Sequence, residues 1–279
     1  MTIQADNKAA EQLEKWQHPY IELYRTLLGL KVEDSYLSIL DEHVSSFAER
    51  FTPSPLTGEG KGEGDNHILQ FEDLLQDWAA FQGLFQQASS IIAEYLPDTN
   101  STLKKLIAQP SVMKKEAKAW YQYSSLHNIA DEIGIDWETL SLCFQTAFHP
   151  ILIRYSEALS PLIIQDSWRR RICPICGGKP DLAFLSKDNG ARWLICSHCD
   201  TEWLFFRLEC PFCGNRDQDS LAYLTNDNEL YRLYTCEQCR KYIKAIDLRH
   251  AKNDVLFPFE RIRTLDLDKQ AVEAGYKRG

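Results

Sequence analysis

The chain has 279 residues, of which 44% are hydrophobic and 25% are charged, and its formal net charge is −9. These values are typical of a globular protein of two or three domains, and they exclude an intrinsically disordered chain. The acidic excess lies in residues 1–166, which carry 12 basic and 24 acidic side chains, whereas residues 167–250 carry 13 and 11. The charge of the first part therefore argues against a polyanionic partner there.

Neither a targeting segment nor a membrane span is predicted. Residues 1–15 are polar and acidic and lack the apolar stretch of a signal peptide. The chain has no run of about 18 apolar residues, the length that a membrane helix needs. We therefore expect a cytoplasmic protein without a membrane span.

The first part of the chain is predicted to be a helical domain, residues 1–167. Its apolar residues recur at helical spacing, with Gly134 as a helix stop and Asp136 as a helix cap. The aromatic stripes on these segments are interpreted as core. The segment 52–66 is rich in proline, glycine and charge, which predicts a flexible loop. The expected helices span about 20–28, 34–51, 68–96, 101–108, 112–133 and 137–148. After an interruption, helix is expected again to about residue 160.

The pattern changes near Pro161, where short β-type runs replace helical periodicity. Segments 173–199 and 210–239 also form an internal repeat: each has a CPxCG turn, a short apolar strand, an Arg-led strand and a CxxC pair. We predict two tandem rubredoxin-like or zinc-ribbon-like modules, 168–208 and 209–255, and a tail, 256–279. The expected strands are Leu182–Leu185, Arg192–Ile195, Leu204–Leu208, Leu221–Thr225, Tyr231–Thr235 and Ile243–Ile246.

Eight of the nine cysteines form four CxxC pairs, and their spacing is that of metal sites. Two residues between the cysteines let one turn present both sulfurs to one ion, and a hairpin of about 20 residues brings the second pair. Four sulfurs in tetrahedral arrangement suit zinc or iron. The predicted ligands of two metal ions are Cys173, Cys176, Cys196, Cys199, Cys210, Cys213, Cys236 and Cys239.

Within each repeat the ligand set is already complete, so one ion per repeat is favoured over sites shared between repeats. Gly177 and Gly214 follow their cysteine pairs, where glycine can adopt a positive φ. Four thiolates close the coordination sphere, which favours a structural site over a catalytic one. His198 is not expected to be a ligand. Redox-active dithiols are a weaker alternative, and the choice between iron and zinc stays open.

Outside the cysteine pairs, no motif of a hydrolase, nucleotide-binding protein or metalloprotease occurs, so no enzyme activity is predicted. Cys143 is interpreted as a buried structural thiol. The run Arg169–Arg171 is more typical of a solvated domain junction than of a nucleic-acid site. Thr201, Glu202, Trp203 and Arg207 form a candidate partner-contact surface, with packing of Trp203 between the modules as the equal alternative.

Two stretches of the cysteine-rich half resemble a known family. The stretch RWLICSHCDTEWLFFRLECPFCG at 192–214 and the stretch RICPICGGKP at 171–180 are similar to the formate dehydrogenase accessory protein FdhE family. All eight paired cysteines of that pattern are present. Residues 1–165 agree with the family only in length and helical character, and the 52–66 segment looks like an insertion.

The resemblance implies a cytoplasmic accessory protein that binds the catalytic subunit of formate dehydrogenase and supports its maturation. It also implies rubredoxin-like metal sites at the eight paired cysteines, with iron as the associated metal. Two alternatives remain: a zinc-ribbon nucleic-acid-binding protein and a rubredoxin-like electron carrier.

Overall fold

The computed structural model describes residues 21–50, 67–225 and 229–279, and these form two compact units. The first unit takes in the described residues up to Pro161 except His67. The second takes in His67 and the described residues from Leu162 to Gly279. The predicted start of the first helix, at about residue 20, and the predicted loop 52–66 lie outside the described residues. Each unit is described by itself below.

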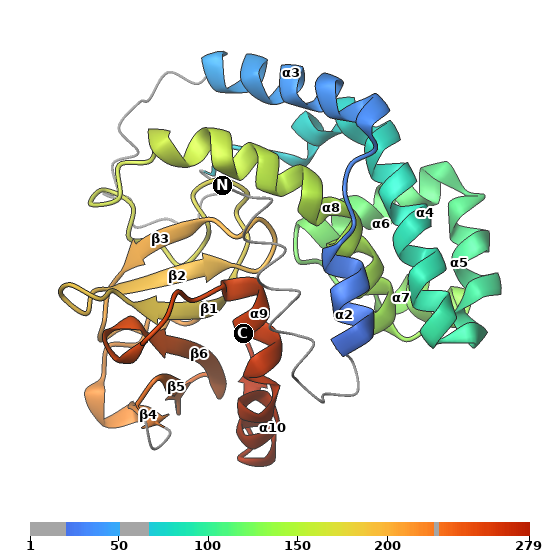
Figure 1. The fold of residues 1–279 in the computed structure, drawn as a ribbon. Helices are drawn as coiled ribbons and strands as arrows, with labels where there is room; N and C mark the ends of the chain where they lie inside the picture. Colours follow the sequence, from blue (N-terminus) through green and yellow to red (C-terminus); the bar gives the residue numbers. More distant parts are fainter. Residues whose placement is uncertain (1–20, 51–66, 226–228) are drawn as a thin grey trace. The chain divides into compact units, whose positions relative to one another are not determined.

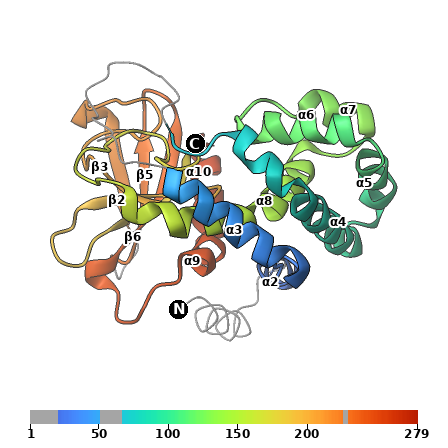
Figure 2. The same cartoon turned by 90° about the horizontal axis from the view of Figure 1, so that it is seen from above.

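The first unit is helical, as predicted. Helix α8 lies at its centre and contacts α3, α4, α6 and α7 (Figures 1 and 2). Asp136 caps α8 by accepting a hydrogen bond from the backbone N–H of Thr139 at 2.7 Å, and Gly134 ends α7 in the left-handed conformation. The helices are α2 (Ile21–Leu28), α3 (Asp34–Arg50), α4 (Trp78–Tyr95), α5 (Asn100–Ile107), α6 (Pro110–Tyr121), α7 (His127–Ile133) and α8 (Trp137–Leu159).

Three helix boundaries differ from the prediction. The expected helix 68–96 begins instead with a 3-10 helix, η1 (Phe71–Asp77), before α4. The expected helix 112–133 is two helices because Tyr123 adopts a φ of 55° and Ser124 donates its N–H to the Ala119 carbonyl, which ends α6. The interruption expected after residue 148 is absent: α8 continues through Pro150, whose loss of one hydrogen bond is offset by burial of its neighbours.

Aromatic side chains fill the core of the helical unit, which confirms that the aromatic stripes of the predicted helices are core residues. The Phe148 ring stacks on Phe81, with centroids 4.2 Å apart, and on Trp120 at 5.3 Å. Each such buried side chain contributes about 1.5–3 kcal/mol to folding. Cys143 is fully buried in α8, and burial raises the pKa of its thiol to about 12, as a structural thiol requires.

The second unit is built on a sheet that both repeats share (Figure 1). Each repeat supplies three antiparallel strands, and the parallel pairing of β1 with β6 joins the two sets, from Leu182 opposite Lys244 to Leu185 opposite Asp247. The strand order is β3-β2-β1-β6-β5-β4. The strands are β1 (Pro180–Leu185), β2 (Arg192–Cys196), β3 (Glu202–Phe205), β4 (Leu221–Thr225), β5 (Tyr231–Cys236) and β6 (Lys241–Asp247).

The predicted strands match these except for the third, expected at 204–208. The chain leaves the sheet after Phe205, so β3 lies two residues earlier and Leu208 belongs to a turn. The strands of both repeats make one sheet. The predicted modules 168–208 and 209–255 would therefore each hold three strands of this sheet and meet where β1 pairs with β6. The division itself stays a prediction.

The tail, for which no secondary structure was predicted, packs on the sheet as α9 (Phe257–Arg263) and α10 (Leu265–Glu273) and ends in β7 (Lys277–Arg278), which pairs parallel with the start of β6. Phe257 stacks on Phe184 of β1, with ring centroids 5.1 Å apart. Ala271 of α10 packs with Leu233 and Tyr242. The tail is thus an integral part of the second unit.

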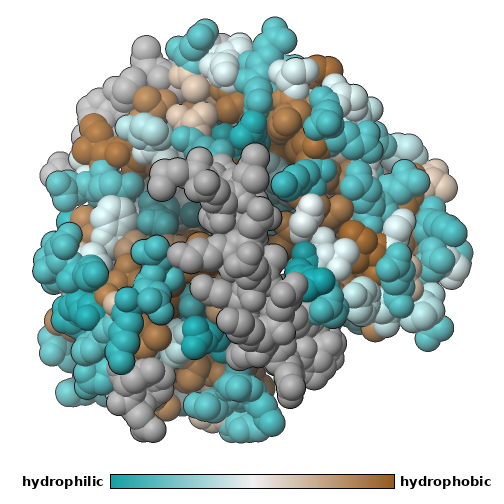
Figure 3. All heavy atoms as spheres, in the orientation of Figure 1, coloured by the Kyte–Doolittle hydropathy of each residue, from teal (hydrophilic) through white to brown (hydrophobic). Residues whose placement is uncertain are grey.

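The surface visible in Figure 3 is largely hydrophilic over the strands of the second unit, with hydrophobic residues scattered among polar ones. Among the helices formed by the described residues, none combines the length and the apolar character that crossing a bilayer requires.

Candidate metal centres

The eight paired cysteines form two clusters, one in each repeat. In each cluster the four sulfur atoms lie within 4.8 Å of one another. Neighbouring sulfurs are 3.3–3.6 Å apart in the first cluster and 3.7 Å apart in the second. Tetrahedral coordination with metal–sulfur bonds of about 2.3 Å requires separations of about 3.8 Å. Both clusters therefore fit one metal ion each, and the expected grouping within each repeat is the one that the structure shows.

The four CxxC turns share one backbone conformation. In each, the residue after the second cysteine has a positive φ, which turns the chain back toward the sulfurs. In three of the turns this residue also donates its N–H to the carbonyl of the first cysteine, at 2.9–3.1 Å. Sequence reasoning found the two glycines and missed the other two positions, where non-glycine residues accept the strain. The four residues are Gly177 (71°), Asp200 (55°), Gly214 (75°) and Arg240 (54°).

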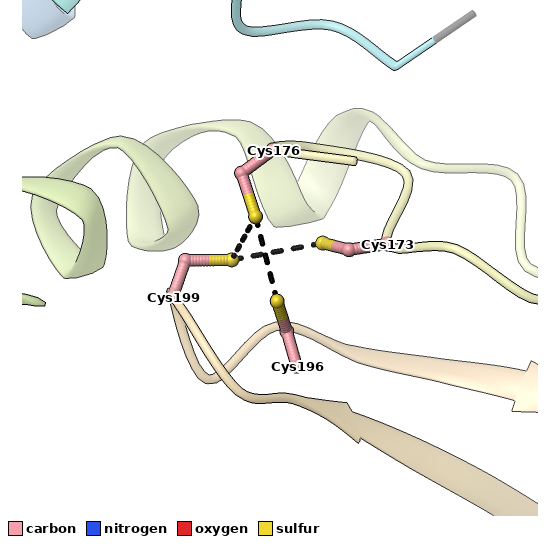
Figure 4. A group of neighbouring side chains, drawn as sticks. All are labelled: Cys173, Cys176, Cys196 and Cys199. Carbon is pink, nitrogen blue, oxygen red and sulfur yellow. Dashed lines mark hydrogen bonds between the residues drawn. The ribbon is translucent and has the colours of Figure 1, made fainter. Parts of the chain in front are cut away.

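All four cysteines of the first cluster are buried. Cys173 and Cys176 come from the loop before β1, Cys196 from the end of β2, and Cys199 from the turn that follows, with all four sulfurs pointing toward one centre (Figure 4). The hydroxyl of Thr201 lies 2.9 Å from the sulfur of Cys199.

The thiols of the first cluster differ in acidity. Burial opposes ionisation of Cys173, but hydrogen bonds from the other three sulfurs hold its pKa well below the usual value. Burial raises the pKa of Cys176 and of Cys196. A metal ion must therefore displace protons from the cluster, since thiolates are the ligands.

The second cluster is more open. Cys213 and Cys239 are partly exposed, whereas Cys210 and Cys236 are buried. Burial opposes ionisation of Cys236, but the N–H of Cys239 and the side-chain amide of Asn215 lower its pKa. Burial raises the pKa of Cys210 and of Cys239. Lys241 stands in this repeat where Thr201 stands in the first, two residues after the fourth cysteine.

Four thiolates leave no position for a substrate at either centre, which suits a structural or electron-transfer role better than Lewis-acid catalysis. The same donor set accepts zinc or iron. His198 is not a member of the first cluster: its backbone N–H donates to the sulfur of Cys196 at 3.3 Å. Trp193 stacks on Phe184, while the ring of Phe212 lies under the ammonium group of Lys241 beside the second cluster.

The candidate partner-contact residues divide into two kinds. Trp203 is fully buried and donates its indole N–H to the Arg170 carbonyl at 2.9 Å, and Thr201 is buried against Cys199. These two side chains support the first module and offer no surface to a partner. Glu202 and Arg207 are exposed, and contact with a partner protein stays a prediction for these two residues.

Sequence reasoning missed two buried arginines, Arg192 and Arg232. They are equivalent residues of the two repeats, and both line a cavity of about 310 Å³ next to the second cluster. The signal was available, because both repeats contain an Arg-led strand. From sequence alone, however, a charged residue at the start of a strand is expected to be exposed to solvent.

Comparison with known proteins agrees with this architecture. The family description "FdhE, central domain" matches residues 172–207, which contain the whole first cluster. An FdhE homologue of Aquifex aeolicus is 35% identical over 150 residues, 52% of each chain. One of Pseudomonas aeruginosa is 34% identical over 128 residues, 41% of this chain and 40% of the relative. The resemblance to the FdhE family is confirmed.

The likeness also extends beyond the cysteine-rich half. A Shewanella baltica FdhE homologue aligns with 92% of this chain and 79% of its own length at 21% identity. The crystal structure of the Pseudomonas aeruginosa FdhE protein shares the fold, with a TM-score of 0.60 and 21% identity over 98% of this chain and 92% of that one. The alignments with the Aquifex aeolicus and Pseudomonas aeruginosa homologues nevertheless span only 52% and 40% of the length of those relatives.

Proposed function

We propose that this protein is a formate dehydrogenase accessory protein, which binds the catalytic subunit of formate dehydrogenase in the cytoplasm and supports its maturation. The observation that carries the proposal is the FdhE central-domain match over residues 172–207, which includes four clustered cysteines and the exposed Glu202 and Arg207. In this role the protein is a binding and assembly factor and not an enzyme.

The eight clustered cysteines are proposed to hold two metal ions, zinc or iron. Zinc would supply folding free energy to modules whose own cores are small, and iron would in addition permit one-electron chemistry. The partly exposed Cys213 and Cys239 favour a rubredoxin-like electron carrier as the second candidate function, because electron transfer requires close approach to the sulfurs.

A capture experiment tests the proposal. The tagged, metal-loaded protein is incubated with the host's formate dehydrogenase catalytic subunit, and with an unrelated molybdoenzyme as control. Selective capture of the formate dehydrogenase subunit is the expected result. Capture of neither protein, or equal capture of both, would contradict the assembly role. Reversible one-electron reduction of bound iron together with a failed capture would favour the electron carrier.

A further inference from the structure

The cavity beside the second cluster lies on the sheet face opposite the C-terminal helices. Leu233 packs against α10, so its neighbour on β5, Tyr234, points to the other face and into the cavity. The connector between the repeats, from Arg207 to Phe212, lines the cavity together with residues of β2, β4, β5 and β6. A cavity of about 310 Å³ is large enough for a side chain or a small ligand.

Positive charge dominates this cavity. Arg192, Arg207 and Lys241 line it, and none of the three has a carboxylate within 4.0 Å among the residues the structure describes. The other charged side chains of the lining are paired: Arg232 with Asp247 at 2.6 Å, and Glu209 with Arg216 at 2.7 Å. A divalent metal held by the four thiolates of the second cluster would add about two negative charges, which leaves a positive balance.

Arg192 is the deepest of these cations, with 3% of its surface exposed. Two of its nitrogens donate to the carbonyls of Arg207 and Glu209, each at 3.2 Å, while its Nε has no hydrogen-bond partner. Burial lowers its pKa to about 10, so it stays charged at neutral pH. A buried guanidinium without a carboxylate is costly, and an anionic ligand would offset that cost.

The end strand of the sheet forms part of the cavity wall through Leu221, Ala222 and Tyr223. In the strand order β4 is terminal, and within the described part of the chain it pairs with β5 alone. The segment Leu221–Thr225 contains no charged residue and no proline, the usual protections of a strand edge. Tyr223 is 51% exposed and Leu224 62%, and Leu208 on the connector is 59% exposed. Such an edge accepts an added strand from another polypeptide.

We propose that an extended, acidic segment of a partner polypeptide adds to β4 and places a carboxylate in the cavity near Arg192 and Arg207. The edge strand selects a polypeptide, since only a peptide backbone can continue the hydrogen-bond ladder of a sheet. The cavity cations without a carboxylate partner favour acidic side chains in the bound segment. The identity of the partner as formate dehydrogenase rests on the proposed function, whereas the docking site does not.

Synthetic peptides test the docking site directly. The metal-loaded full chain is titrated against a fluorescent ten-residue peptide of alternating valine and glutamate, and against its valine–lysine counterpart. The acidic peptide is expected to bind, with affinity falling as salt rises, and Arg207→Glu to weaken it about tenfold or more. Absence of binding, equal binding of the lysine peptide, or insensitivity to Arg207→Glu would each overturn the proposal.

A matched pair of variants examines the edge strand. Leu224→Glu and Leu224→Lys remove the same apolar side chain at an exposed position and differ only in the charge they introduce. The glutamate variant is expected to lose about tenfold in affinity for the acidic peptide relative to the lysine variant. Equal affinities of the two variants would show that no acidic segment lies along β4 and would overturn the proposal.

The two proposals can fail separately. If the catalytic subunit is captured but the acidic peptide does not bind, the accessory function stands and the docking site is wrong. If the acidic peptide binds as expected but the subunit is not captured, the docking site stands and serves another partner.

Discussion

The two cysteine clusters have the same backbone turns but different surroundings. All four cysteines of the first cluster are buried, whereas Cys213 and Cys239 of the second are partly exposed. The hydroxyl of Thr201 touches a sulfur of the first cluster, and the equivalent residue of the second repeat, Lys241, lines the cavity instead. A repeated motif therefore fixes the position of the sulfurs but not their access to solvent.

The C-terminal tail contacts both repeats in different ways. At the first cluster, Arg261 forms ion pairs with Asp181 at 2.8 Å and Asp200 at 2.7 Å, and donates to the Cys196 carbonyl at 3.0 Å. At the second cluster, the backbone N–H of Lys277 donates to the Arg240 carbonyl at 2.8 Å. The second cluster lies toward the β4 end of the sheet and borders the cavity. We expect the first centre to be mainly structural and the second to be the more reactive.

The largest expected effect is on stability. Cys196→Ser removes a ligand of the buried cluster. Because this variant can no longer bind the first metal ion with four thiolates, its free energy of unfolding should be lower by more than about 4 kcal/mol. Cys239→Ser, at a partly exposed position, is the matched variant and should cost clearly less. Chemical denaturation together with the metal content of each variant measures both. Equal destabilisation would contradict the assignment of different roles.

A smaller effect is expected on metal release. When a chelator is added to the zinc-loaded protein, one equivalent should leave about tenfold faster than the other, a difference of about 1.4 kcal/mol in the free energy of local opening. The fast equivalent should be lost in Cys213→Ser and retained in Cys176→Ser. Release of both ions at one rate would show that exposure of the sulfurs does not control exchange.

The smallest expected effect concerns Thr201. Thr201→Val keeps the shape of the side chain and removes the hydroxyl beside Cys199, which should weaken metal binding at the first site about tenfold. In the iron-loaded protein the reduction potential of that site should fall, because a hydrogen bond to sulfur stabilises the reduced state. Lys241→Met, at the equivalent position of the second repeat, is the control. An unchanged potential in Thr201→Val would indicate that the hydroxyl contact is only packing.

The sequence predicted the features that depend on local pattern. Helical periodicity, the CxxC spacing and the repeat located the helices, most strands and both clusters, because each depends on residues close in the chain. The joining of β1 to β6, the folded tail and the cavity around Arg192 depend on contacts between distant segments. Trp203 shows the limit most clearly: it is fully buried and its indole N–H donates to the carbonyl of Arg170, a contact with a distant residue that the local pattern does not predict.

The parallel pairing of β1 with β6 has a consequence for the order in which the second unit forms. Cys199 completes the first cluster, yet β1 acquires its second neighbour only when residues 241–247 have been synthesised. Contacts between such distant segments form late, because closing a long loop is entropically costly. During translation the first repeat can therefore capture its metal ion while β1 is still an open edge, and metal supply at that moment would decide whether the nascent chain folds or aggregates.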